Sequence, residues 1–134
     1  MSTPVSLAAL TWLVVGCGLG RSPAPAPVNS REVVAAPQAG SIDVIWIGHA
    51  TALIRLGDRW ILTDPNFSNR VGVVYERYVE PGLEASDLPP LAAVLVSHAH
   101  LDHLDAASLR AVPSAAAVIA PPDALSSIPR DPDL

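Results

Sequence analysis

The chain has 134 residues, half of them hydrophobic, with 8 basic and 13 acidic side chains and a net charge of −5. This length suits one modest domain. The acidic balance argues against nucleic acid as a partner, because a surface that binds nucleic acid needs an excess of Lys and Arg. Cys17 is the single cysteine, so an internal disulfide is excluded.

The N-terminal segment has the features of a bacterial export signal. Residues 7–16, "LAALTWLVVG", form an apolar run that is too short to cross a membrane as a helix. The run ends in "VVGC", which resembles a lipobox, where the cysteine is lipidated before cleavage. We expect residues 1–17 to be a lipoprotein-type signal peptide and Cys17 to carry a lipid anchor. The expected location is the bacterial cell envelope, at the outer membrane or cell surface.

One feature departs from the pattern of an export signal, because "MSTPVS" before the apolar run contains no Lys or Arg. The alternative is a fortuitous apolar N-terminus. Residues 18–41 follow and are rich in Pro and Ala, a composition that favours extended, polyproline-like chain. We expect a linker that holds a domain away from a membrane; the alternative is a leader without a role.

The folded part is expected over residues 42–134 and opens with three strands. "IDVIWIG" is apolar at nearly every position, which predicts a strand buried on both faces. "ALIRL" and "WILTD" follow, and Gly57-Asp58 between them predicts a hairpin turn. Pro65 ends the third strand, because proline cannot donate a hydrogen bond to a sheet. The large apolar side chains of these strands are expected in the core, among them Trp46 and Trp60.

The rest of the domain is expected to alternate strand and helix. Residues 66–90 contain several loop signals, among them the dipeptides Pro81-Gly82 and Pro89-Pro90. "LAAVLVS" predicts a buried strand, and "AAAVIAP" predicts another. Between them, "DAASLRAV" predicts a short helix that Asp105 caps and Pro113 stops. Strands followed by a strand, a helix and a strand indicate an α/β fold.

The segment "VLVSHAHLDHLD" holds three of the four histidines of the chain directly behind an apolar run. In extended chain, His98 and His100 lie on the same side, and two imidazoles so placed make half of a site for a metal such as zinc. Asp102 and His103 follow in the turn and can serve a second position close by. Histidines are often ordinary residues, but this spacing behind a strand predicts a site for two metals, which can activate a hydroxide between them.

The motif "SHAHLDH", residues 97–103, resembles the signature of the metallo-β-lactamase superfamily. "WIGHATALIRLGDRWILTDPNFSNRV" and "LPPLAAVLVSHAHLDHLDAASL" resemble the branch that contains N-acyl-phosphatidylethanolamine phospholipase D and related lactonase-like hydrolases. The resemblance covers residues 42–121. It implies an αββα sandwich of the α/β class, two zinc ions in the complete domain, and hydrolysis of a small-molecule or lipid substrate.

The resemblance also implies roles for residues of the motif. His98 and His100 would bind one metal, and Asp102 and His103 the other. Asp102 would in addition act in catalysis, by orienting the nucleophilic water or taking its proton.

Further polar residues carry weaker signals. His49 and Asp64 end neighbouring strands and are expected near the metals as outer groups that hold the ligands. The alternatives are a satisfied histidine at a strand end and a turn cap before Pro65. The loop "NFSNR" is expected at a pocket rim, and Arg70, Arg77 or neither would meet a phosphate.

The chain departs from the superfamily pattern in one respect. After His103 it contains no histidine, although the resemblance implies further ligands downstream. A sandwich of this type needs roughly 200 residues. We therefore expect the N-terminal half of the domain only, inactive by itself.

Two hypotheses follow from this departure. The first is the first half of a lipid-anchored zinc hydrolase, and the second is a truncated, non-catalytic lipoprotein. Phosphodiester, lactone and phosphonate substrates stay open.

Overall fold

A computed structural model of the protein describes residues 24–25, 40, 42–72, 74–113, 115 and 117–128. The predicted signal peptide, with Cys17, lies outside these residues. The predicted linker is described only at 24–25 and 40, and Ala24 forms an isolated parallel bridge with Val79. Within the described ranges, no helix is long and apolar enough to cross a bilayer.

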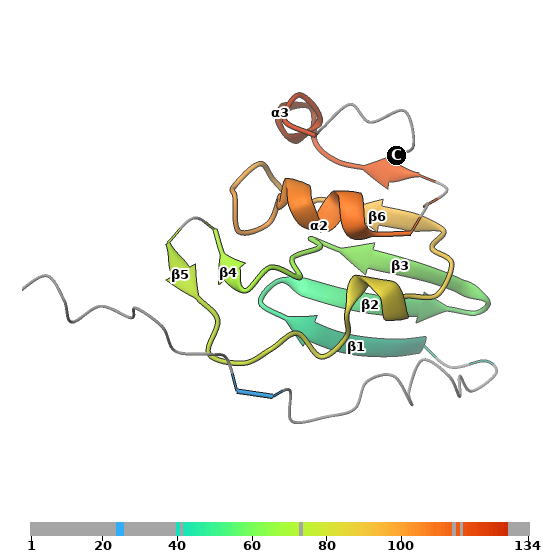
Figure 1. The fold of residues 1–134 in the computed structure, drawn as a ribbon. Coiled ribbons are helices and arrows are strands. Elements are labelled where there is room, and N and C mark those ends of the chain that lie inside the picture. The colour runs from blue at the N-terminus through green and yellow to red at the C-terminus, as the bar shows by residue number, and fades with distance from the viewer. Residues whose placement is uncertain are drawn as a thin grey trace, which may run out of the picture.

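A five-stranded mixed sheet organises the molecule, with strand order β1-β2-β3-β6-β7 (Figure 1). The first three strands form an antiparallel meander, and β6 and β7 are added in parallel to β3. The strands are β1 (Ile42–Gly48), β2 (Thr51–Leu56), β3 (Arg59–Thr63), β6 (Ala93–Leu95) and β7 (Val118–Ile119).

The meander follows the predicted pattern closely. Leu56 pairs with Arg59, so Gly57 and Asp58 form the two-residue turn that the sequence predicts. Gly57 has a φ of +61°, which glycine adopts at little cost.

Helix α2 (Ala106–Ala111) confirms the predicted helix. The side chain of Asp105 accepts a hydrogen bond from the Ala107 N–H at 3.2 Å, as an N-cap does. The helix ends before Pro113, which cannot continue it.

The segment 66–90 is rich in loops, as predicted, and its short elements are the two-stranded hairpin of β4 (Arg70–Val71) and β5 (Tyr75–Glu76) and the 3-10 turn η2 (Ala85–Asp87). One expectation about the later segment needs correction. The strand predicted over "AAAVIAP" is only two residues long, because Ala115 pairs with Leu91 only as an isolated bridge. A short helix, α3 (Pro122–Leu125), follows it.

The core lies on one face of the sheet, where Figure 1 shows α2 and η2. Leu53 and Leu62 from the sheet and Leu109 from α2 are at most 1% exposed. The buried cluster continues through the loop before β6 and comprises Ile45, Ile47, Leu53, Trp60, Leu62, Leu83, Leu88, Leu91, Val94, Val96, Leu104, Leu109, Val112 and Ala124.

The prediction that β1 is buried on both faces is wrong. Ile45 and Ile47 are buried, but Val44 and Trp46 are 65% and 68% exposed, because the helices cover only the opposite face of the sheet. Trp46 is therefore not a core residue, whereas Trp60 is, at 8% exposure. The Trp46 indole N–H instead donates to the carbonyl oxygen of His49 at 2.9 Å and braces the turn after β1.

Candidate metal centre

The carboxyl ends of three strands meet at one edge of the sheet. β1 is antiparallel to β2, β2 is antiparallel to β3, and β3 is parallel to β6, so β1, β3 and β6 point the same way. His49 follows β1, Asp64 follows β3, and the segment that begins at Ser97 follows β6. The topology therefore brings together polar residues from three distant parts of the sequence, at the edge where α/β proteins place their sites.

Asp64 joins these strand ends through hydrogen bonds. Its N–H donates to the Leu95 carbonyl oxygen at 2.8 Å. Its carboxylate accepts from the Ser97 N–H and the Ser97 hydroxyl, both at 2.7 Å. A buried Asp64, 6% exposed, thus fixes the first residue of the histidine motif.

The backbone is strained at two positions of this edge. His49 and Asp64 have φ values of 53° and 37°, in the left-handed region that residues other than glycine rarely occupy. Such conformations cost of order 1 kcal/mol and persist where surrounding contacts hold them. The contacts are present here, since Trp46 holds the His49 carbonyl oxygen, and the Thr51 hydroxyl donates to the Asp64 carbonyl oxygen at 2.7 Å.

His98 and His100 meet on the same side of the chain, as the alternation of extended backbone predicts. The Nε2 atom of His98 lies 3.0 Å from Nδ1 of His100, and the two ring centroids are 4.5 Å apart. The centroid of the His98 ring also lies 4.1 Å from the centroid of the His103 ring. The three motif histidines therefore form one cluster of imidazoles.

A second group of ligand atoms adjoins this cluster. His49, Asp102 and His103 each offer one ligand atom, and these atoms lie within 4.8 Å of one another. Asp102 Oδ2 is 3.1 Å from His49 Nε2 and 3.5 Å from His103 Nε2. Imidazole nitrogens and a carboxylate oxygen are the donors that zinc takes from proteins, so the donor set fits this metal.

Asp64 controls the orientation of His103. The Asp64 Oδ2 atom lies 2.9 Å from His103 Nδ1. With the proton on Nδ1, His103 donates to Asp64 and leaves the lone pair of Nε2 directed at the group that contains Asp102. A carboxylate behind a metal-binding histidine works in this way, by fixing the tautomer and ring direction.

The electrostatics of the edge favour two ionised carboxylates. Burial raises the pKa of Asp64, but hydrogen bonds with His103 and Ser97 outweigh this, so its pKa lies below the ordinary value of 3.8. Slight burial raises the pKa of Asp102. A backbone hydrogen bond, a hydrogen bond with His49 and the charges of His103 and His49 lower it by more, so its pKa also lies below the ordinary value. Both groups are therefore anionic at neutral pH, as a carboxylate that binds or supports a cation must be.

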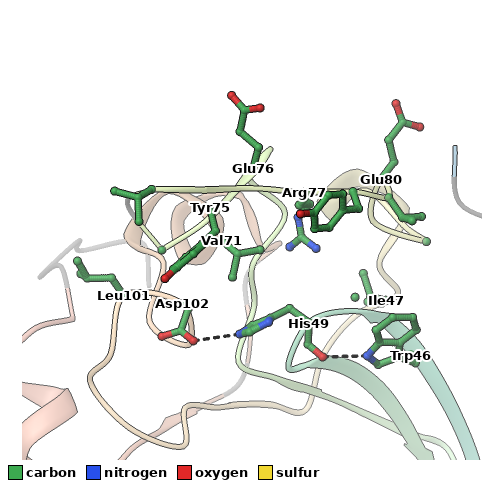
Figure 2. A pocket seen from close by; sticks show the side chains of 16 residues that line it. Trp46, Ile47, His49, Val71, Tyr75, Glu76, Arg77, Glu80, Leu101 and Asp102 are labelled. Atoms are coloured by element: carbon green, nitrogen blue, oxygen red, sulfur yellow. Dashed lines mark hydrogen bonds and ion pairs between the residues drawn. The ribbon is translucent and has the colours of Figure 1, made fainter. Parts of the chain in front are cut away.

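A largely apolar cavity of about 690 Å³ opens directly above this edge. Figure 2 shows its walls: the β4–β5 hairpin lies on one side, and His49 and Asp102 lie on the other. Trp46, Tyr75 and Leu101 line it although they are 60–73% exposed. Apolar walls with a few convergent polar groups are typical of ligand sites.

The structure brings together six residues that the sequence singled out and separates others. His49, Asp64, His98, His100, Asp102 and His103 all lie at this edge. Arg70 is largely exposed and pairs with Glu76 at 3.9 Å, whereas Arg77 is buried beside the cavity.

Two polar residues of the site, Asn66 and Ser97, had no individual role assigned from the sequence. Asn66 was expected at a pocket rim but is only 1% exposed, and its side-chain amide donates to the Asp102 carbonyl oxygen at 3.2 Å. Ser97 holds Asp64 and lies 2.9 Å from His98 Nδ1. The sequence offered one signal for each residue. Ser97 stands directly before the first histidine of the motif, and Asn66 follows Pro65 at the end of the third predicted strand.

Comparisons with known proteins agree with this geometry. The family model of the beta-lactamase superfamily domain matches residues 59–134. An uncharacterized protein of Mycobacterium bovis is 36% identical over 101 residues, and a metal-dependent hydrolase of Cupriavidus taiwanensis is 36% identical over 100. The N-acyl-phosphatidylethanolamine-hydrolyzing phospholipase D 1 of Caenorhabditis elegans is 38% identical over 71 residues.

These alignments cover half of the chain or more but at most a third of each relative. They include 72%, 73% and 50% of the chain, and 27%, 33% and 20% of the Mycobacterium, Cupriavidus and Caenorhabditis proteins respectively. The chain thus spans about a quarter of the length of these relatives and corresponds to an N-terminal region. The family model covers more than half of the chain, including the whole histidine motif. The chain therefore belongs to the metallo-β-lactamase superfamily.

Proposed function

We propose that this chain supplies the metal-binding edge of a zinc-dependent hydrolase that cleaves a phosphodiester bond in N-acyl-phosphatidylethanolamine-type lipids. The observation that carries the proposal is the gathering of all four histidines with Asp102 at one sheet edge, beneath an apolar cavity. His98 and His100 would hold one zinc ion, and Asp102 and His103 a second one in the complete domain. His49 belongs to the second group by distance and is a further candidate ligand.

The residues of the chain would have different roles in hydrolysis. Bound zinc supplies Lewis-acid chemistry and lowers the pKa of water. The Asp102 carboxylate, which is anionic at neutral pH, would accept a proton from the nucleophilic water. Asp64 would keep His103 in the tautomer that leaves Nε2 free, and Ser97 would keep Asp64 in place.

The cavity supports a substrate with an apolar chain. Its lining is contributed mainly by Ile47, Val71, Val74, Tyr75 and Leu101, and it reaches His49 and Asp102 at the metal-binding edge. A lipid bound here would have its headgroup ester near the ligands. The name of the Caenorhabditis relative agrees with a lipid phosphodiester, whereas that of the Cupriavidus relative specifies only metal dependence. Lactone hydrolysis on the same fold is therefore the second candidate activity.

The exposed face of the sheet supports the αββα arrangement for the complete domain. The apolar side chains of Ile42, Val44 and Trp46 on β1 have no cover among the described residues. A continuous apolar sheet face normally packs against another layer. We propose that a second sheet packs on this face.

The same protein would be anchored to the bacterial envelope through Cys17. Two or more acyl chains, each contributing about 0.8 kcal/mol per buried methylene, give stable anchoring. Mass spectrometry of the N-terminus tests this proposal, because a lipid-modified Cys17 is expected first in the mature chain. An unmodified N-terminus at Met1 would contradict it.

The activity is tested on the protein isolated from the organism that encodes it. Its mass is measured first, then its zinc content by plasma mass spectrometry, and then hydrolysis of N-acyl-phosphatidylethanolamine and of an acyl lactone in mixed micelles. We expect two zinc ions per protein and loss of turnover in EDTA. A mass equal to that of this chain, without zinc or turnover, would instead support the truncated, non-catalytic lipoprotein.

A further inference from the structure

Arg77 is a buried cation directly after β5, at the wall of the cavity. It is 7% exposed. Its Nε atom donates to the Ser68 carbonyl oxygen at 2.7 Å, and Nη2 donates to the Asn66 carbonyl oxygen at 2.5 Å and to Asn66 Oδ1 at 3.0 Å. Three hydrogen bonds from one edge of the guanidinium group, donated by Nε and Nη2, therefore fix the direction of the whole group.

The remaining terminal nitrogen, Nη1, is turned toward the cavity. Among the described residues it has no hydrogen-bond acceptor, and Figure 2 shows the guanidinium pointing into the space beside His49. A Cβ atom at Gly48 would lie only 2.9 Å from Nη1. The absence of a side chain at Gly48 thus lets this nitrogen approach the turn that carries His49.

The positive charge of Arg77 has no carboxylate at ion-pair distance within the described part of the chain. Figure 2 shows the carboxylates of Glu76 and Glu80 pointing away from the cavity. Burial lowers the pKa of Arg77, and Asp105 opposes this from farther away, although the Asp105 carboxylate already accepts hydrogen bonds from Ser68 and Ser108. A buried guanidinium without an anion is unfavourable, so the arrangement suits an anion that comes from outside.

We propose that Arg77 is a positioning residue that binds the phosphate group of an amphiphilic substrate through Nη1, while the apolar walls of the cavity hold the chain. This inference rests on the proposed function for the identity of the reaction, but the binding itself needs no metal. The guanidinium would hold the phosphate beside His49 and Asp102. Arginine suits this role because its fixed fork keeps donors in place for an oxyanion.

The test measures binding to the whole metal-free chain in EDTA. The probes are n-decyl phosphate and n-decanol, below any micelle concentration, in isothermal titration calorimetry. Wild-type chain should bind decyl phosphate about tenfold or more tightly than decanol, as expected for a charge-assisted hydrogen bond. Arg77→Gln should remove this preference and leave decanol binding unchanged. The matched control is Arg70→Gln on the same hairpin, which is exposed and should alter neither affinity by more than about twofold.

Equal wild-type affinities for the two probes would overturn the inference, and this comparison needs no variant. A preference for decyl phosphate that survives Arg77→Gln would also overturn it. Equal loss of both ligands in Arg77→Gln would show that Arg77 only supports the cavity wall, which contradicts the inference as well. Because all binding is measured without metal, a failure to bind zinc or to hydrolyse lipid would reject the proposed function and leave this result intact.

Discussion

The two walls of the cavity differ in polarity and in how their side chains are held. The lower wall includes the turn after β1 with His49, and Leu101 and Asp102 of the segment after β6; the Asp102 side chain pairs with His49, and the Asp102 carbonyl oxygen accepts a hydrogen bond from the Asn66 amide. The upper wall is the β4–β5 hairpin, where Val74 and Tyr75 are more than 70% exposed. A fixed polar wall suits metal binding, whereas an exposed apolar wall suits contact with a chain of methylenes. Substitutions on the two walls should therefore affect different measured quantities.

Substitution of Asp102 by Asn should have the largest effect. Asparagine keeps the shape but loses the charge and the basicity, so turnover in an active preparation should fall by about a hundredfold or more. Turnover and zinc content are measured together, with circular dichroism for the fold. Asp58→Asn, in the exposed turn after β2, is the matched control and should retain full activity. Near-normal turnover in Asp102→Asn would favour a site with one metal.

His98→Ala should empty one metal position. Zinc affinity depends on each direct ligand, so we expect about one zinc equivalent less per protein. Plasma mass spectrometry after dialysis gives the stoichiometry. The control is Leu101→Ala. Leu101 stands between two candidate ligands in the sequence, but its side chain lines the cavity, so this variant should keep the full zinc content. Equal zinc loss in both variants would mean that the whole turn, and not the His98 ring, determines binding.

Asp64→Asn tests the support behind the lower wall. The amide can still accept from Ser97, but it loses the charge that holds the protonated Nδ1 of His103. Loss of such an outer carboxylate typically weakens metal binding by about 10-fold to 100-fold. Competition with a zinc chelator measures the affinity. An unchanged affinity would show that the His103 orientation is set by other contacts.

Tyr75→Ala on the upper wall should have the smallest effect and a different character. Loss of apolar contact should raise KM for a long-chain substrate severalfold, by about 1 kcal/mol of binding, while kcat and zinc content stay constant. The effect should decrease as the acyl chain is shortened. A reduction of kcat without a change in KM would contradict the division of roles between the walls.

The sheet itself shows where local patterns were sufficient and where they failed. The turn at Gly57-Asp58 and the helix capped by Asp105 depend on contacts between residues close in sequence, and both were predictable. The burial of β1 could not be predicted in this way, because Trp46 and Trp60 are equally apolar and nothing in the neighbouring residues tells which of them is covered. Only the position of α2 and η2 on one face decides that Trp60 is covered and Trp46 is not.

The sequence by itself determined the spacing of the candidate metal ligands, because two-residue alternation places His98 and His100 on one side and a tight turn follows with Asp102 and His103. The tertiary structure decided which distant residues join them. His49 reaches Asp102 across 53 positions, and Arg77 turns one nitrogen into the cavity, because parallel strand ends and a returning hairpin meet at one edge. Such contacts depend on strand order and chain direction, which no short stretch of residues encodes.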